Sequence, residues 1–253
     1  MSSFLPIKLR GINKAFRVNG RTVQALEGIS LQARAQEFVS LIGPSGCGKS
    51  TLLNIVCGLM EPDAGEILLH GRREANRLGR TSYMPQRDLL LPWRKLLDNI
   101  ILGPEVMGRD LTQARREARE LLPLFGLEGF ENSYPATLSG GMRQRAALMR
   151  TFLCRQEIVL LDEPFGALDA LTRRTMRKWL LEVWAQFRQT AIFVTHDVEE
   201  AVFLSDRIYV FSPRPGKIVH ELEVNLPRPR PEHLNSDPRF VAYRDELLTS
   251  LGL

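Results

Sequence analysis

The sequence contains 253 residues, of which 44% are hydrophobic and 25% charged, and its formal net charge is +5. Such proportions are ordinary for a soluble globular protein, so we expect one compact unit with room for an inserted subdomain. No apolar run reaches the ~18 residues that a membrane-spanning helix needs, and the N-terminus lacks the apolar stretch of a signal peptide. We therefore expect a cytosolic protein.

The cysteine spacing and the charge pattern argue against two further classes of protein. Cys47, Cys57 and Cys154 show no Cys-x-x-Cys or Cys/His metal spacing, which disfavours a zinc site and a disulfide framework. We expect Cys57 and Cys154 to be small buried hydrophobic residues. Basic residues are mixed with acidic ones, as in Ala114–Glu120, so we interpret most of them as solvated helix faces. The net charge alone does not indicate a nucleic-acid partner.

Short apolar runs predict the first strands of the chain. They lie at Ile7–Ile12, which is followed by a turn at Asn19-Gly20, at Glu37–Gly43 and at Gly65–Gly71. Apolar residues at helical spacing predict a helix over Leu111–Phe125, with Thr112 as its N-cap.

Two continuous apolar runs, Glu157–Pro164 and Thr190–Asp197, enclose a helical pattern over Thr172–Phe187. Such runs are typical of parallel strands that helices cover on both faces. This order predicts a doubly wound α/β core with ligand groups at the carboxyl ends of the strands. Short strands at 207–212 and 217–224, the proline-rich Leu226–Pro231 and a terminal helix complete the prediction.

The segment Gly43–Thr51, GPSGCGKST, matches the pattern G-x-x-x-x-G-K-[ST] between an expected strand and an expected helix. In this context the pattern forms a phosphate-binding loop. Its glycines let backbone amides surround a β-phosphate, Lys49 reaches the β- and γ-phosphate oxygens, and Ser50 can coordinate Mg²⁺. The sequence therefore predicts a nucleotide site.

A magnesium nucleotide also needs carboxylates at a strand end. Asp162 can hold the metal there, and Glu163 can polarise the attacking water as general base. His196 ends another expected strand and could bind the γ-phosphate, although a lone histidine is more often structural. Gln86 follows a further expected strand. Phe16 could stack on adenine or could belong to the core.

The segment Leu138–Arg150, LSGGMRQRAALMR, is a second candidate phosphate-binding element. Ser139, Gly140 and Gly141 open an amphipathic helix, whose N-terminal amides and dipole favour an anion. One chain thus carries two elements of this kind.

The phosphate loop, Gln86, LSGGMRQR, LLDEP, GALD and His196, in this order and spacing, resemble the ATP-binding subunits of ATP-binding cassette (ABC) transporters. The resemblance implies an α/β fold with a P-loop NTPase (RecA-like) core, an antiparallel β subdomain and an inserted α-helical subdomain. It implies an ATP-binding domain over 1–225, with the helical subdomain at about 87–155, and a C-terminal extension over 226–253.

The resemblance also implies roles for individual residues. It implies that two chains bind two ATP molecules head to tail, with the second phosphate-binding element of each chain contacting the nucleotide of the other. Phe16 stands where the family usually has a tyrosine. The residues implied in ATP binding are Phe16, Gly43, Pro44, Ser45, Gly46, Cys47, Gly48, Lys49, Ser50, Thr51, Ser139, Gly140, Gly141 and Asp169. Those implied in catalysis are Glu163, His196, Gln86 and Lys49, and those implied in Mg²⁺ binding are Ser50, Gln86 and Asp162.

Two alternatives share the phosphate loop. A nucleic-acid or translation ATPase usually carries two cassettes, a long coiled coil or zinc-binding cysteines, which this sequence lacks. A small-molecule kinase would leave LSGGMRQR without a role.

Asp88–Ile100, DEPFGALDALTR and FSPRPGKI resemble the importer subfamily for nitrate, sulfonate, taurine and related compounds, which also includes cassettes for thiamine-precursor pyrimidines. The resemblance implies uptake of a small anionic or pyrimidine-like solute. The implied partners are a second ATP-binding subunit, a membrane permease and, indirectly, an extracytoplasmic substrate-binding protein, at the cytoplasmic face of the inner membrane.

The apolar run RDLLLPWRKLLDN, residues 87–99, has two interpretations. It can form the local core of the helical subdomain. It can also form a groove that receives a short cytoplasmic helix of the permease, with Trp93 as an anchor.

Overall fold

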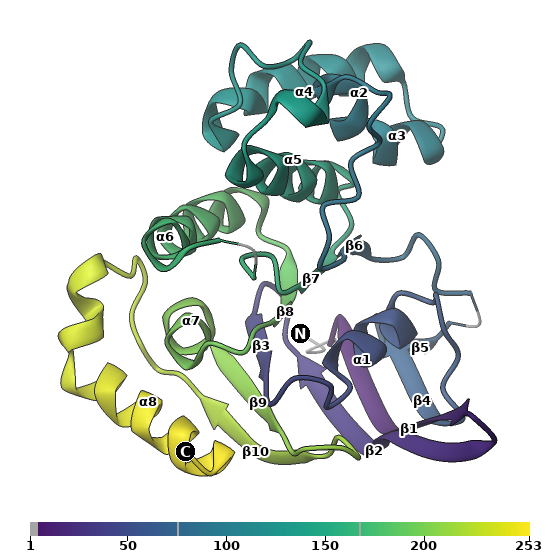
Figure 1. Ribbon diagram of the computed structural model, residues 1–253, viewed down its shortest axis with the longest axis vertical. Helices are drawn as coiled ribbons and strands as arrows, with labels where there is room; N and C mark the ends of the chain where they lie inside the picture. The colour runs from purple at the N-terminus through teal and green to yellow at the C-terminus, as the bar shows by residue number, and fades with distance from the viewer. Residues whose placement is uncertain (1–4, 75, 167) are drawn as a thin grey trace.

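The computed structural model describes residues 5–74, 76–166 and 168–253, and in these ranges the strands form two sheets (Figure 1). The smaller sheet has the order β2-β1-β4-β5 and is antiparallel. Its strands are β1 (Ile7–Val18), β2 (Arg21–Ala33), β4 (Ala64–Leu69) and β5 (Arg72–Arg73). The expected first strand is therefore longer than predicted and continues to the turn at Asn19-Gly20.

The larger sheet has the order β10-β9-β3-β8-β7-β6, with every pair parallel except β9 and β10. Its strands are β3 (Phe38–Ile42), β6 (Ser82–Met84), β7 (Ile158–Asp162), β8 (Thr190–Val194), β9 (Arg207–Phe211) and β10 (Ile218–Glu223). Every residue of β3, β7, β8 and β9 is buried, which explains why these strands are continuous apolar runs.

Different layers cover the two faces of the larger sheet. On one face Leu161 and Phe193 join a core with residues of α5 (Gly140–Leu153), α6 (Ala170–Phe187) and α7 (Val198–Leu204). On the other face Leu160 and Ile192 join a core with α1 (Lys49–Val56) and the antiparallel sheet. Helices therefore lie on both faces as expected, and on the second face the antiparallel sheet packs beside α1.

The helical part of the molecule lies between β6 and β7 in sequence and at one end of the fold in space (Figure 1). It contains α2 (Leu96–Ile100), α3 (Leu102–Val106), α4 (Leu111–Phe125) and α5. The predicted cap of α4 is wrong by two residues. Asp110 is the N-cap, because its carboxylate accepts hydrogen bonds from the backbone amides of Thr112 at 2.8 Å and Gln113 at 3.4 Å.

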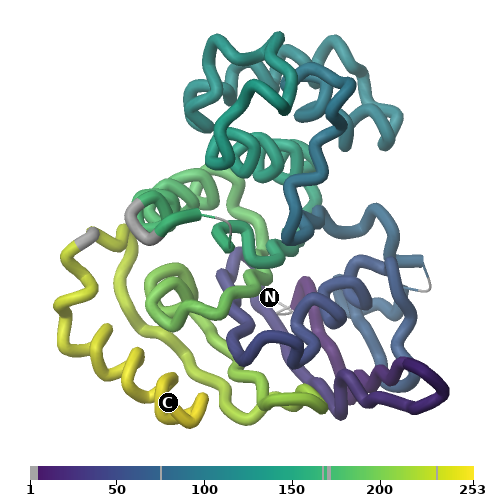
Figure 2. Tube along the Cα trace, viewed as in Figure 1, coloured from purple at the N-terminus to yellow at the C-terminus, as the bar shows by residue number. Residues whose placement is uncertain are grey.

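After β10 the chain runs along the outer side of α7 and ends in α8 (Pro238–Leu251) (Figure 2). Short 3₁₀ helices form at Pro135–Thr137 and, in this last segment, at Glu232–Ser236. Arg228 and Arg230 donate hydrogen bonds to the carbonyl groups at the end of α7, among them Leu204 at 2.7 Å and Phe203 at 2.8 Å. Across the described ranges, no helix combines the length and the apolar character needed to cross a bilayer.

The cysteines differ in burial. Cys47 and Cys57 are 1% and 6% exposed, so Cys57 is buried as expected. Cys154 is only partly buried, which corrects the prediction for this residue. Burial raises the pKa of the Cys57 and Cys154 thiols.

Candidate active site

The phosphate loop connects β3 to α1 at the carboxyl end of the larger sheet. Gly48, the residue before α1, has a φ of 111°, and a Cβ there would lie 2.6 Å from Leu26. A side chain at this position would therefore be strained and would clash. Lys49 is 5% exposed, and its ammonium group donates to the carbonyl oxygens of Gly43 at 2.7 Å and Pro44 at 3.0 Å. These bonds hold the lysine charge inside the loop.

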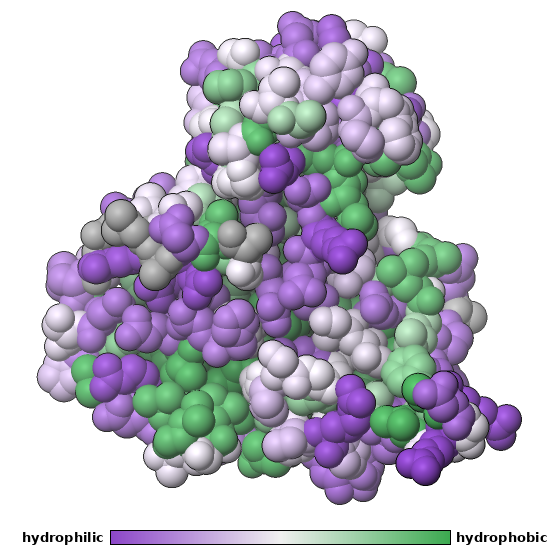
Figure 3. Space-filling model, in the orientation of Figure 1, coloured by the Kyte–Doolittle hydropathy of each residue, from purple (hydrophilic) through white to green (hydrophobic). Residues whose placement is uncertain are grey.

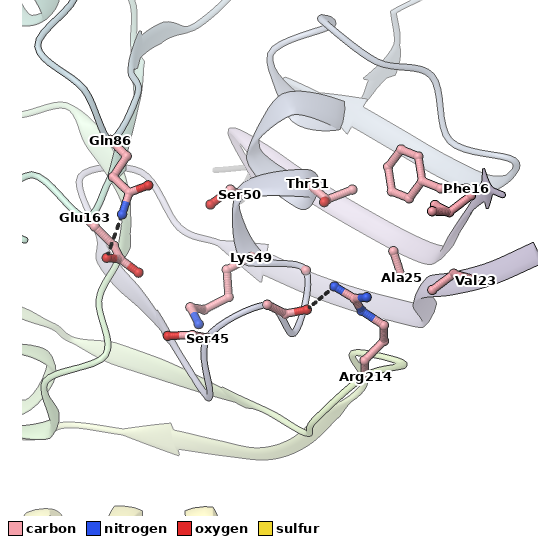
Figure 4. Close-up of a pocket in the computed structure, with 13 residues that line it drawn as sticks. Phe16, Val23, Ala25, Ser45, Lys49, Ser50, Thr51, Gln86, Glu163 and Arg214 are labelled. Atoms are coloured by element: carbon pink, nitrogen blue, oxygen red, sulfur yellow. Dashed lines mark hydrogen bonds between the residues drawn. The ribbon is translucent and has the colours of Figure 1, made fainter.

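A cavity of about 470 Å³ opens over this loop (Figure 4). The antiparallel sheet supplies its apolar end through the ring of Phe16 with Val18, Val23 and Ala25. The lining is completed by Ser45, Gly46, Gly48, Lys49, Ser50, Thr51, Gln86, Glu163 and Arg214. An apolar end that continues into amides, a lysine and carboxylates suits a molecule with a flat ring at one end and anionic groups at the other.

Asp162 ends β7 beneath the phosphate loop and is 3% exposed. The hydroxyl of Ser50 donates to its Oδ1 over 3.0 Å. Burial raises the pKa of the Asp162 carboxyl, and the hydrogen bond from Ser50 and the charge of Lys49 oppose this shift. A hydroxyl and a carboxylate oxygen are thus brought together at the edge of the sheet.

Glu163 follows directly, with a φ of 46° that is uncommon for a residue other than glycine. Its backbone amide donates to Val194 O at the end of β8 over 3.0 Å. Its Oε2 accepts a hydrogen bond from Gln86 Nε2 at 3.2 Å and lies 3.5 Å from Nδ1 of His196. Gln86, Glu163 and His196, which follow the neighbouring strands β6, β7 and β8, therefore come together around the carboxylate of Glu163.

The second phosphate-binding element lies outside this group. Ser139 is the N-cap of α5, and its hydroxyl accepts a hydrogen bond from the amide of Met142 at 3.2 Å. Asp169 is the N-cap of α6 and accepts from the amide of Thr172 at 3.0 Å. Neither Ser139, Gly140, Gly141 nor Asp169 lines the cavity over Lys49. Ala167, in the predicted GALD motif, is outside the described residues.

Sequence reasoning missed Arg214, which lies between β9 and β10 and donates to Gly46 O at 3.0 Å. Only its place in FSPRPGKI, a segment noted for another reason, could have drawn attention to it.

The apolar run over residues 87–99 is divided between core and surface. Leu90, Leu96 and Leu97 are at most 8% exposed, so the core interpretation is right for them. Leu89 and Trp93 are 57% and 72% exposed. Figure 3 shows apolar surface along the junction between the helical part and the sheets.

Comparisons with known proteins agree with this geometry. The family model described as "ABC transporter" matches residues 26–166. An aliphatic sulfonates import ATP-binding protein of Bacillus cereus is 43% identical over 89% of this chain and 89% of its own. A taurine import ATP-binding protein of Rhizobium johnstonii is 40% identical over 90% of this chain and 89% of its own.

Among solved structures, the dimeric ATP-binding cassette MJ0796 in a post-hydrolysis state, bound to ADP and Pi, matches with a TM-score of 0.74 and 30% identity. The match covers 87% of this chain and 99% of the other. The phosphate loop, the carboxylates at the end of β7 and the helical part between β6 and β7 agree with these matches. The chain therefore belongs to the ABC transporter family of ATP-binding subunits.

Proposed function

We propose that the chain is the ATP-hydrolysing subunit of an ABC importer and works as a head-to-tail dimer. The observation that carries this proposal is the division of the predicted phosphate-binding groups into two sets. Lys49, Ser50 and Glu163 line one cavity, whereas Ser139 and Asp169 do not. Both sets of residues can contact ATP if Ser139 and Asp169 contact the nucleotide that is bound by a partner chain.

Within one chain, the cavity fits ATP. The ring of Phe16 offers a stacking face for adenine, and the loop amides and Lys49 would face the β- and γ-phosphates of a bound nucleotide. Arg214, which lines the same cavity, stabilises the phosphate loop through its hydrogen bond to Gly46 O.

The side-chain oxygen atoms beside the phosphate loop also suit Mg²⁺, because this ion prefers oxygen ligands. The hydroxyl of Ser50 and the carboxylate of Asp162 stand together at 3.0 Å, and the side-chain amide of Gln86 offers a third oxygen. These three residues would hold the metal, which supplies positive charge to the β- and γ-phosphates when bound.

Glu163 is the group that we assign as general base for the attacking water. Gln86 donates to one of its oxygens at 3.2 Å and thereby fixes its orientation. His196, whose Nδ1 lies 3.5 Å from the same oxygen, is half exposed and can donate to a γ-phosphate. The chemistry is then hydrolysis of ATP to ADP and phosphate.

The names of the relatives suggest the task of this ATPase. The two relatives are described as import subunits for aliphatic sulfonates and for taurine. We infer that this chain likewise drives uptake of a small solute, anionic or pyrimidine-like, through a separate permease at the cytoplasmic face of the membrane. A substrate-binding protein would deliver the solute, and nucleic acid has no part in this function.

A mixed-dimer experiment tests the proposal. Lys49→Ala removes the charge that faces the phosphates, and Ser139→Arg blocks the second phosphate-binding element; each homodimer should be inactive. The two chains carry different affinity tags, so that the mixed dimer can be isolated and its ATPase activity measured.

If the two elements act across the interface, one site of the mixed dimer combines both defects and the other is intact. Activity should then recover at least about tenfold over either homodimer. If both elements act on the nucleotide of their own chain, every site is damaged and no activity returns, which would refute the head-to-tail arrangement. Measuring the dimer bound to its permease avoids loss of signal from a single site.

A further inference from the structure

Arg173, on the first turns of α6, contacts two loops of the active site at once. Its Nη2 donates to Leu168 O at 3.0 Å, directly before Asp169. Its Nη1 lies 3.8 Å from Oδ2 of Asp197, the N-cap of α7, and its Nε lies 3.7 Å from Oε1 of Glu200 in the first turn of α7. A single side chain therefore spans from the loop of Asp169 to the loop of His196.

Glu200 continues this connection to His196. It is 3% exposed, and its Oε2 accepts a hydrogen bond from Thr195 Oγ1 at 2.6 Å. The same hydroxyl accepts a hydrogen bond from the amide of Asp197 at 3.0 Å. The residues on both sides of His196 are thus held through Glu200, whereas the His196 side chain is 49% exposed.

The central pair of this connection is incompletely bonded. Within the described part of the chain, the buried atoms Arg173 Nε and Glu200 Oε1 have no hydrogen-bond partner. Their separation of 3.7 Å exceeds that of an ordinary hydrogen bond. A small cavity of about 10 Å³ lies among Arg173, Glu200, Thr195, His196 and Glu163. A small displacement of either loop would pair the two atoms, and buried unpaired groups favour such pairing.

We propose that Arg173 and Glu200 are positioning residues that couple the two ATP sites of the dimer. This inference rests on the proposed function, in which Asp169 faces the nucleotide of the partner and His196 faces the nucleotide of its own chain. Contact at Leu168–Asp169 draws Arg173 toward Glu200, and Glu200 sets the loop that carries His196. Closure at one site thereby aligns the histidine of the other.

Arg173→Met and Glu200→Gln test this coupling, since each keeps the approximate side-chain size and removes the charged partner. Arg174→Met, on the exposed side of the same turn, is the matched control. We expect either test variant to lower kcat by about threefold to tenfold and to bring the Hill coefficient for ATP toward one. The Kd for ATP should stay within about twofold of wild type, because neither residue lines the nucleotide cavity.

The double variant distinguishes coupling from simple helix packing. If the two residues act through each other, Arg173→Met/Glu200→Gln is no slower than the slower single variant. Arg173→Lys keeps one charge but cannot reach both loops, and should retain intermediate cooperativity. Wild-type kcat and Hill coefficient in Glu200→Gln, or multiplicative losses in the double variant, would overturn the inference.

Failure of this inference is distinguishable from failure of the proposed function. If the Lys49→Ala and Ser139→Arg chains do not restore activity when mixed, the dimer proposal itself fails. If they do restore it while Arg173→Met retains wild-type kinetics, only the coupling role of Arg173 and Glu200 is refuted.

Discussion

Gln86 Nε2 donates a hydrogen bond to Glu163 Oε2 over 3.2 Å, although 77 residues separate the two in sequence. Gln86 follows β6, where the chain leaves the sheet for the helical part, and Glu163 follows β7, where the chain has returned. A rotation of the helical part would therefore move the side-chain amide of Gln86 and, through it, the carboxylate of Glu163, the proposed general base.

Replacement of Gln86 by leucine should slow hydrolysis without removing nucleotide binding. The leucine keeps the approximate volume but neither donates to Glu163 nor offers an oxygen to Mg²⁺. We expect kcat to fall about tenfold or more, with the Kd for ATP in the absence of Mg²⁺ within about twofold of wild type. Stopped-flow binding and steady-state assays on the same preparation measure both quantities. Unchanged turnover would separate Gln86 from the chemistry.

Lys49 and Glu163 should separate binding from hydrolysis. Lys49→Ala removes the charge held inside the phosphate loop, so both binding and turnover should be lost. Glu163→Gln has the same shape but is a poor base, so ATP should remain bound while hydrolysis falls by about 10²-fold or more. Single-turnover assays with labelled ATP measure this difference. Near-normal hydrolysis by Glu163→Gln would assign the base elsewhere.

Glu200 should make the stability of the protein depend on pH. Burial raises its pKa from an ordinary 4.5 to about 7; Thr195, Arg173 and Arg177 oppose the shift, and Asp197 adds to it. His196 and Glu163 line the same small cavity. Between these two pKa values the folded chain binds the proton more tightly than the unfolded chain does. This group therefore lowers the free energy of unfolding as pH rises through that window.

Glu200→Gln has no charge to bury and should lose this contribution. Relative to wild type, its free energy of unfolding should increase by up to about 3 kcal/mol between about pH 5 and pH 8. Urea unfolding of both proteins at the two pH values gives the difference. A constant offset between them would show that Glu200 does not titrate in this range.

The cap of α4 gives a prediction about stability alone. The carboxylate of Asp110 accepts from two amides, whereas Thr112 lies inside the helix. Asp110→Ala should cost about 1 kcal/mol of folding free energy, and Thr112→Ala should have little effect. Thermal unfolding of the two variants compares them directly. A larger loss from Thr112→Ala would restore the cap predicted from sequence.

Trp93 should matter for the permease more than for folding. Its side chain is 72% exposed, so Trp93→Ala should change stability by less than about 0.5 kcal/mol and leave basal ATPase activity intact. Leu96, at 0% exposure, is the contrast: Leu96→Ala should cost about 2–5 kcal/mol. Co-purification with the permease should be weakened by the tryptophan change. Retained assembly would show that the permease contacts another surface.

The sequence predicts those elements best whose signal is local and continuous. The buried strands β3, β7 and β8 are apolar runs, and the phosphate loop is a contiguous motif, so all were found. Helices α2, α3 and α7 have five to seven residues, which is fewer than two full turns, so their apolar residues do not repeat often enough to reveal a helix and they were not found. Asp110 was missed because an aspartate and a threonine both suit a cap and differ by two positions.

Contacts between segments that are distant in the sequence could not be predicted from local patterns. Arg214 reaches Gly46 only because the chain turns back between β9 and β10. Apolar and polar residues alternate along the strands of the antiparallel sheet. This alternation does not indicate which face of the larger sheet the antiparallel sheet covers. Arg173 and Glu200 meet because α6 and α7 pack against each other, and no motif in the sequence marks them as a pair.

Arg228 and Arg230, which bind the carbonyl groups at the end of α7, limit where this chain can be truncated or fused. Arg230 is 4% exposed and, with Arg228, holds the carbonyl groups of Val202, Phe203, Leu204 and Ser205. A chain shortened to the end of β10 would expose these groups on the helix that begins next to His196. Leu253 is 84% exposed, so a tag or fusion joined at this residue would leave these contacts intact. A tail exchanged with that of a relative would have to carry both arginines with it.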